Sequence, residues 1–127
     1  MYDIRHRVGI KAPQHRVYEM LATKEGLAGF WSIPEGDSTV ESPDERVRWR
    51  VVDGVPEWVG TTLTFELKQD GGETVLLFTH ADGREPTEIL HHSSTKWATY
   101  LIGLRSGLEG GSFTAFPHDT PVSSVWR

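Results

Sequence analysis

One long helical pattern, spanning residues 85–111, constrains the fold more than any other stretch of the chain. Its core-facing positions recur at spacings of three and four residues, which places them on one stripe of an α-helix. These positions are Leu90, Ser94, Trp97, Leu101, Leu104 and Leu108. A core helix usually carries Leu or Ile where this stripe carries Trp97, so we expect the helix to close one side of a cavity.

Alternation of apolar and polar residues predicts four β-strands in the rest of the chain. They cover residues 2–11, 46–53, 58–68 and 73–81. The tight turn Asp70-Gly71-Gly72 joins the last two strands, and strands joined in this way are antiparallel.

Two short helices are expected between the first two of these strands. Pro13 suits the first position of a helix that runs to about Leu21, because proline lacks the amide hydrogen that a first turn leaves unpaired. Thr23 then predicts the N-cap of a second helix, which ends near Phe30 and Trp31.

Two segments carry no strong signal for a helix or a strand. Turn-forming residues dominate positions 32–44, so we expect a loop there, with at most a short strand at 39–41. Residues 112–127 are expected to form an extended tail. The sequence has no internal repeat and no linker, so residues 1–127 are expected to form a single domain that ends in this tail.

The composition argues against several functional classes. A net charge of -5 argues against a nucleic-acid partner, because phosphates need a broad basic surface and the densest basic run is limited to Arg46, Arg48 and Arg50. The absence of cysteine removes disulfides, thiol nucleophiles and thiolate metal sites. No apolar run approaches the ~18 residues of a membrane span, and the N-terminus lacks a signal-peptide core. We therefore expect no membrane span and a cytoplasmic location.

The order of a strand, two short helices, antiparallel strands and a long C-terminal helix is that of the helix-grip fold. The sequence blocks that agree with it are residues 12–21 with Phe30 and Trp31, and residues 46–49, 58–65, 74–80 and 96–110. In these blocks the chain resembles the activator of Hsp90 ATPase homologue-like branch of the SRPBCC superfamily, also called START or Bet v 1-like. The resemblance implies an α+β fold, in which a curved antiparallel sheet wraps the C-terminal helix and leaves a cavity between them.

One departure from the family affects the edge of the sheet. Members usually carry two more strands between the Phe-Trp pair and the strand that holds Trp49, and residues 32–44 are too short for both. We therefore expect the chain to lack the second and third strands of the family. The strand of Trp49 would then be an unprotected edge, which a second copy of the chain could cover to give a homodimer.

Large aromatic residues fall on the inward faces of the predicted elements. They are Trp31, Trp49, Phe65, Phe78 and Trp97, with Leu101 one helical turn beyond the last. These side chains either line an apolar pocket for a flat or hydrophobic small molecule or simply fill the core. We favour the pocket, because the family implies a cavity.

Polar contacts in this pocket could come from three histidines or from the hydroxyls of Ser93, Ser94 and Thr95. His80 lies on the inward face of its strand, and His91 and His92 open the long helix, so these imidazoles are expected to converge. Adjacent helical residues point about 100° apart, so His91 and His92 do not favour a metal site. We expect no metal, no cofactor and no catalytic residue, with His80 or His91 as a polar contact or, alternatively, as a structural side chain.

Three functions remain open at this stage. The first is a small non-enzymatic domain that binds a hydrophobic small molecule. The second is an enzyme similar to polyketide cyclases and dehydratases, which the superfamily also contains, with His80 or His91 as acid or base. The third is a module that binds a chaperone and stimulates its ATPase activity, which the resemblance alone implies.

Overall fold

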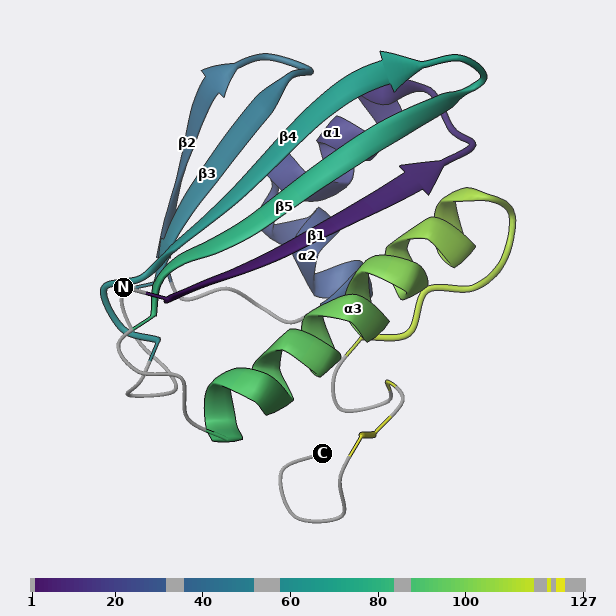
Figure 1. The fold of residues 1–127 in the computed structure, drawn as a ribbon. Helices are drawn as coiled ribbons and strands as arrows, with labels where there is room; N and C mark the ends of the chain where they lie inside the picture. The colour runs from purple at the N-terminus through teal and green to yellow at the C-terminus, as the bar shows by residue number, and fades with distance from the viewer. Residues whose placement is uncertain are drawn as a thin grey trace.

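A curved five-stranded sheet faces a long helix in the computed structural model of this chain (Figure 1). The structure describes residues 2–31, 36–51, 58–83, 88–115, 119 and 121–122, and of residues 2, 36–42 and 82–83 it describes the main chain alone. The expected helical residues 85–87 and part of the expected tail therefore lie outside the described residues.

All neighbouring strands of the sheet are antiparallel, and their order is β1-β5-β4-β3-β2. The strands are β1 (Tyr2–Ile10), β2 (Gly36–Ser42), β3 (Arg46–Val51), β4 (Thr62–Asp70) and β5 (Glu73–Gly83). The predicted α+β helix-grip fold is confirmed, and β1 and β2 form the two edges of the sheet.

Strand register places the apolar residues of neighbouring strands on one shared face. Phe65 of β4 lies opposite Phe78 of β5, and Leu63 lies opposite His80. On the other side of β5, His6 of β1 also lies opposite Phe78. Because side chains alternate between the two faces of a strand, these residues all point towards the helical side of the sheet.

Three helices cover that face: α1 (Gln14–Ala22), α2 (Lys24–Phe30) and α3 (Glu88–Leu108). The Thr23 hydroxyl accepts a hydrogen bond from the Gly26 amide at 3.0 Å, which confirms the predicted N-cap of α2. Gly110 has φ of 101°, the left-handed conformation expected just after the end of α3. None of the described helices has both the length and the apolar character needed to cross a membrane.

The hydrophobic core lies between the sheet and the helices. Trp97, Leu101, Leu104 and Leu108 of α3 are all buried, so the helical stripe predicted for the second half of α3 is confirmed. Among the described elements, those that pack most extensively against α3 are β1 and α2, whereas α1 packs on α2, β3 and β4. Large side chains must therefore fill the space between α3 and the central strands.

The expectation of a loop over residues 32–44 is wrong for residues 36–42, which form β2 and pair with β3 from Gly36 opposite Val51 to Ser42 opposite Arg46. The strand of Trp49 is consequently not an edge, because β2 lies between it and solvent. Pairing explains the error: the backbone groups of β3 offer β2 a hydrogen-bonding partner, and this outweighs the weak strand propensity of its own residues.

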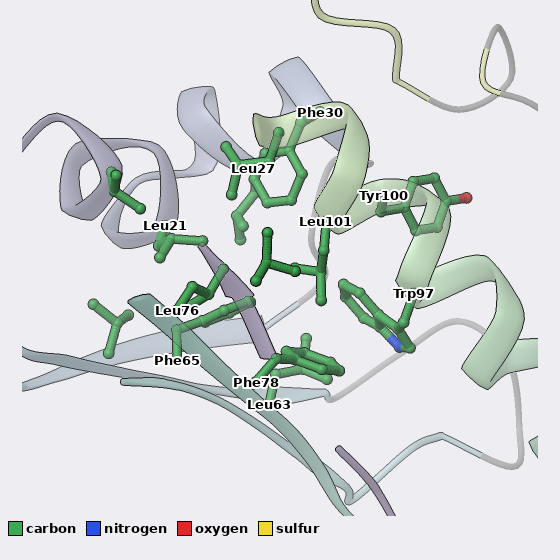
Figure 2. Close-up of a cluster of buried hydrophobic side chains, with 14 of the residues drawn as sticks. Leu21, Leu27, Phe30, Leu63, Phe65, Leu76, Phe78, Trp97, Tyr100 and Leu101 are labelled. Atoms are coloured by element: carbon green, nitrogen blue, oxygen red, sulfur yellow. The ribbon is translucent and has the colours of Figure 1, made fainter. Parts of the chain in front are cut away.

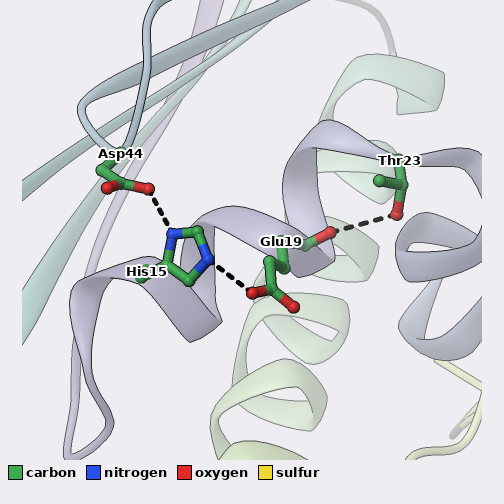
Figure 3. A network of polar contacts seen from close by, with 4 residues as sticks. All are labelled: His15, Glu19, Thr23 and Asp44. Atoms are coloured by element: carbon green, nitrogen blue, oxygen red, sulfur yellow. Dashed lines mark hydrogen bonds and ion pairs between the residues drawn. The ribbon is translucent and has the colours of Figure 1, made fainter.

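A polar network holds the turn after β2 against α1 (Figure 3). Asp44 adopts a positive φ of 62°, which aspartate tolerates better than most residues. Its carboxylate lies 2.7 Å from Nδ1 of His15, and Nε2 of the same ring lies 2.6 Å from the Glu19 carboxylate. Gln14 donates a further hydrogen bond to the Asp44 carbonyl oxygen. These contacts fix the β2–β3 hairpin to the first helix.

Candidate functional site

Aromatic and aliphatic side chains fill the space between the sheet and α3 (Figure 2), and the Trp97 ring contacts the rings of Trp31, Phe78, His80 and Tyr100. The ring centroid of Trp97 lies 4.4 Å from that of Phe78 and 4.8 Å from that of Trp31. Phe78 in turn lies 5.4 Å from Phe65 on the neighbouring strand. The rings form tilted contacts, the geometry that aromatic pairs prefer over face-to-face stacking.

The arrangement of the elements explains why α3 carries tryptophan at position 97. The main chain of α3 packs against β1 and α2, so a side chain must reach further to contact β5 and the end of α2 together. An indole supplies this reach, whereas a leucine at the same position is smaller and would leave part of the space empty. The aromatic cluster therefore links α3 to the middle of the sheet.

His80 forms a directed chain of hydrogen bonds at one side of this cluster. The Trp97 indole N–H donates to Nδ1 of His80 at 3.2 Å. Nε2 of His80 lies 2.7 Å from the Thr61 hydroxyl, which itself donates to the main-chain oxygen of Trp58. Because the hydroxyl proton of Thr61 is used for Trp58, Thr61 must accept from His80, and the imidazole is neutral with its proton on Nε2.

The surroundings of His80 favour this neutral form. The residue is 4% exposed, and the Trp58 ring meets it edge-on at 5.3 Å. Burial lowers the pKa of His80 to about 4, and the charge of Asp3 opposes this effect without reversing it. A proton on Nδ1 would also face the Trp97 N–H, so protonation and the Trp97 contact exclude each other.

The structure brings together most of the residues predicted to form the site, but not all of them. Trp31, Phe65, Phe78, His80 and Trp97 share direct ring contacts, and Leu101 is fully buried one turn beyond Trp97. Trp49 is buried as well, although its indole N–H donates to the Leu21 carbonyl of α1 at 2.7 Å. Their role as a ligand-binding wall stays a prediction.

His91 is the predicted site residue that the structure places apart from His80. It is exposed on α3, whereas His80 is buried between α3 and the sheet. The imidazole that approaches the cluster instead is His6, which stacks on Phe78 at 6.4 Å and donates from Nε2 to the Ser94 carbonyl oxygen at 3.1 Å. Alternation along β1 gives His6 the same face as the buried Ile4 and Val8, but its contact with α3 depends on how the helix packs on β1.

A second buried polar cluster on α3 has no counterpart among the sequence predictions. Lys96 forms an ion pair with Asp119, and the two side chains are 7% and 8% exposed. Nζ of Lys96 also lies 4.9 Å from the ring centroid of Tyr100. The apolar periodicity of the helix did not indicate this cluster, because a periodicity argument assigns lysine to the solvent-facing side.

Comparisons with known proteins agree with this fold. Neither a protein-family model nor a curated protein sequence matches the chain. The solution structure of the Aha1 dimer from Colwellia psychrerythraea is similar with a TM-score of 0.78 and 31% sequence identity, over 87% of this chain and 98% of that one.

Two more distant structures share the fold. The AHSA1-like protein of Rhizobium etli is 18% identical over 94% of this chain and 89% of that one, with a TM-score of 0.69. CalU16 from Micromonospora echinospora is also 18% identical, over 87% of this chain and 67% of that one, with a TM-score of 0.69. The likeness to the Colwellia protein, at 31% identity over nearly its whole length, places this chain in the Aha1 family of SRPBCC-fold proteins.

Proposed function

We propose that this domain binds an uncharged, ring-containing small molecule against the half-buried rings at the margin of the aromatic cluster that lies between the sheet and α3. The observation that carries the proposal is the continuous series of ring contacts from Trp31 through Trp97 to Phe78 and Phe65. Such a series offers a flat apolar ligand successive aromatic faces and edges, which bind rings without requiring charge.

Two half-buried tryptophans indicate where a ligand would enter. Trp31 contacts Trp97 on one side of the cluster, and Trp58 contacts His80, itself a neighbour of Trp97. A ligand that stacked on either of these rings would extend the aromatic series outwards. His80 would supply the polar contact: a ligand carbonyl could accept its Nε2 proton in place of the Thr61 hydroxyl. The exposed His91 is less suited to this role, because water competes for its hydrogen bonds.

Thermal-shift screening with flavonoids, polyketide-like aromatics and lipids tests the proposal. A ligand present at 100 times its Kd stabilises the fold by about 2.7 kcal/mol, a shift that is readily measured. Trp31→Ala should weaken binding by at least about tenfold, because it removes a stacking partner worth ~1.4 kcal/mol or more. Ile102→Ala is the matched control, since Ile102 is 51% exposed on α3. The proposal fails if no compound stabilises the protein or if both variants bind alike.

Protein binding is the second candidate function, and membership of the Aha1 family favours it. The homologue from Colwellia was solved as a dimer, and β2 leaves one edge of the present sheet open to strand pairing. We propose that this edge pairs with a second copy of the chain, or that the domain binds an Hsp90-type chaperone and stimulates its ATPase. Light scattering on a sizing column, alone and with the host chaperone, tests both ideas; a monomer that forms no complex and leaves the ATPase rate unchanged would eliminate them.

A further inference from the structure

Lys96 is the most unusual residue of α3, because it is a lysine with only 6% of its surface exposed. Lysine is almost never fully buried unless it is paired. One of its partners is Asp119, whose side chain is 8% exposed and which comes 23 residues later in the chain. The buried ammonium group of Lys96 therefore forms an ion pair with the carboxylate of a residue that follows α3 in the chain.

Tyr100 completes the surroundings of this ion pair. It lies four residues after Lys96, so both side chains are on the same face of α3. Figure 2 shows that its hydroxyl points away from the aromatic cluster. Burial, together with the charge of Asp119 and a hydrogen bond to it, raises the pKa of Tyr100 above its usual range. The phenol thus remains protonated, so its O–H is available as a donor beside the ion pair.

Stability alone does not account for burying these two charges. The attraction within a buried ion pair often fails to exceed the cost of removing both ions from water, and well-packed apolar residues serve as well or better. What a lysine and a tyrosine add is a defined arrangement of donors. An ammonium group and a phenol O–H together match the two oxygen atoms of a carboxylate, whereas a phosphate dianion would require more donors.

We propose that Lys96 and Tyr100 form a carboxylate-binding site on the flank of α3, which Asp119 of the same chain occupies. The site holds Asp119 close to Trp97 of the aromatic cluster, since Trp97 follows Lys96 directly and its ring meets that of Tyr100 at 5.9 Å. A free carboxylate, from a small molecule or from an acidic peptide, would compete with Asp119 for the same donors. The site does not depend on whether the domain binds an apolar ligand.

Chemical rescue tests this proposal directly. Asp119→Ala removes the Asp119 carboxylate from the site and should clearly lower the denaturation midpoint of the full chain. Sodium acetate should restore stability, by about elevenfold in the folding equilibrium constant at ten times its Kd, and sodium chloride at equal ionic strength should not. The wild type, whose site is occupied, and the Lys96→Met/Asp119→Ala double variant, which lacks the cation, should show no acetate-specific gain.

The result that would overturn the proposal is an Asp119→Ala protein that acetate and chloride stabilise equally. If this variant does not fold in chloride, acetate should allow it to fold, and failure in both salts would count against the site. Asp119→Asn gives an independent measurement, because it keeps the size of the side chain. Loss of the carboxylate should lower the pKa of Tyr100 in an ultraviolet titration, with Tyr100→Phe as the control; an unchanged titration would also contradict the proposal.

Discussion

His15 and His80 show how position decides the chemistry of one residue type. His15 is exposed on α1 between two carboxylates, and its hydrogen bond to Asp44, with the charges of Asp44 and Glu19, raises its pKa. His80 is buried between an indole and a hydroxyl, and burial lowers its pKa to about 4. At the exposed site, the neighbouring carboxylates determine the pKa of the imidazole. In the core, the cost of removing the charged form from water determines it.

The two histidines also differ in what they hold together. His15 joins the β2–β3 turn to α1 at the surface, where ion pairs contribute little to stability because water and salt screen them. His80 joins α3, β5 and the residues before β4 within the core, where a polar group that loses its partners keeps the full cost of burial. Comparing variants of the two residues should therefore separate these contributions.

The largest effect is expected from His80→Ala. The change creates a cavity and leaves the Trp97 N–H without its acceptor, so it should lower the free energy of unfolding by about 2–4 kcal/mol. His15→Ala is the matched control and should shift the urea midpoint far less. Equal losses for the two variants would show that burial does not distinguish these residues.

The second-largest effect is expected in the pH dependence of stability, to which His80 and His15 contribute with opposite signs. The unfolded chain binds a proton at His80 below its usual pKa of 6.5, whereas the folded chain does so only near 4, so stability falls as the pH drops from 6.5 to 4. The difference between these two pKa values corresponds to on the order of 3 kcal/mol. For His15 the folded pKa is raised, so its contribution is complete below pH 6.5 and is lost as the pH rises through the folded pKa.

Urea denaturation between pH 4 and pH 8 measures both slopes. In His80→Gln, the free energy of unfolding should depend less on pH between pH 6.5 and pH 4. In His15→Gln, it should depend less on pH above pH 6.5. If His80→Gln loses stability at acid pH as steeply as the wild type does, the acid dependence comes from carboxylates rather than from His80.

The smallest effect is expected from Asp44→Asn. Asparagine tolerates the positive φ at this position and can still accept a hydrogen bond from His15, but it carries no charge. The pKa of His15 should therefore fall towards 6.5 with little change in stability, which an NMR titration of the ring protons measures. A pKa that stays raised would make Glu19, rather than Asp44, the principal partner.

Periodicity in the sequence predicted much of the fold. The spacing of Trp97, Leu101 and Leu104 identified the buried stripe of α3, and alternation identified the inward faces of β1, β4 and β5. Both patterns depend on local geometry, since a helix repeats every 3.6 residues and a strand every two. The candidate site followed from the same patterns, because its aromatic residues lie on these inward faces.

Local sequence patterns gave wrong predictions where a contact with a distant part of the chain outweighs the local preference of a residue or segment. Residues 36–42 read as turn-forming, yet pairing with β3 makes them a strand. Lys96 reads as a surface residue, yet Asp119 allows it to be buried. His91 reads as a site residue, yet the position of α3 relative to β1 brings His6 to the cluster instead.

The sequence by itself determined which residues of the main strands and of α3 face the core, because neighbours three, four or two positions away carry that information. Only the tertiary structure decided which polar groups meet: His80 with Thr61 and Trp97, Lys96 with Asp119, and His15 with Asp44. These partners are 17 to 29 residues apart. Their pairing depends on strand register and helix packing, and the exposure of each site then decides whether neighbouring charges or loss of hydration sets its chemistry.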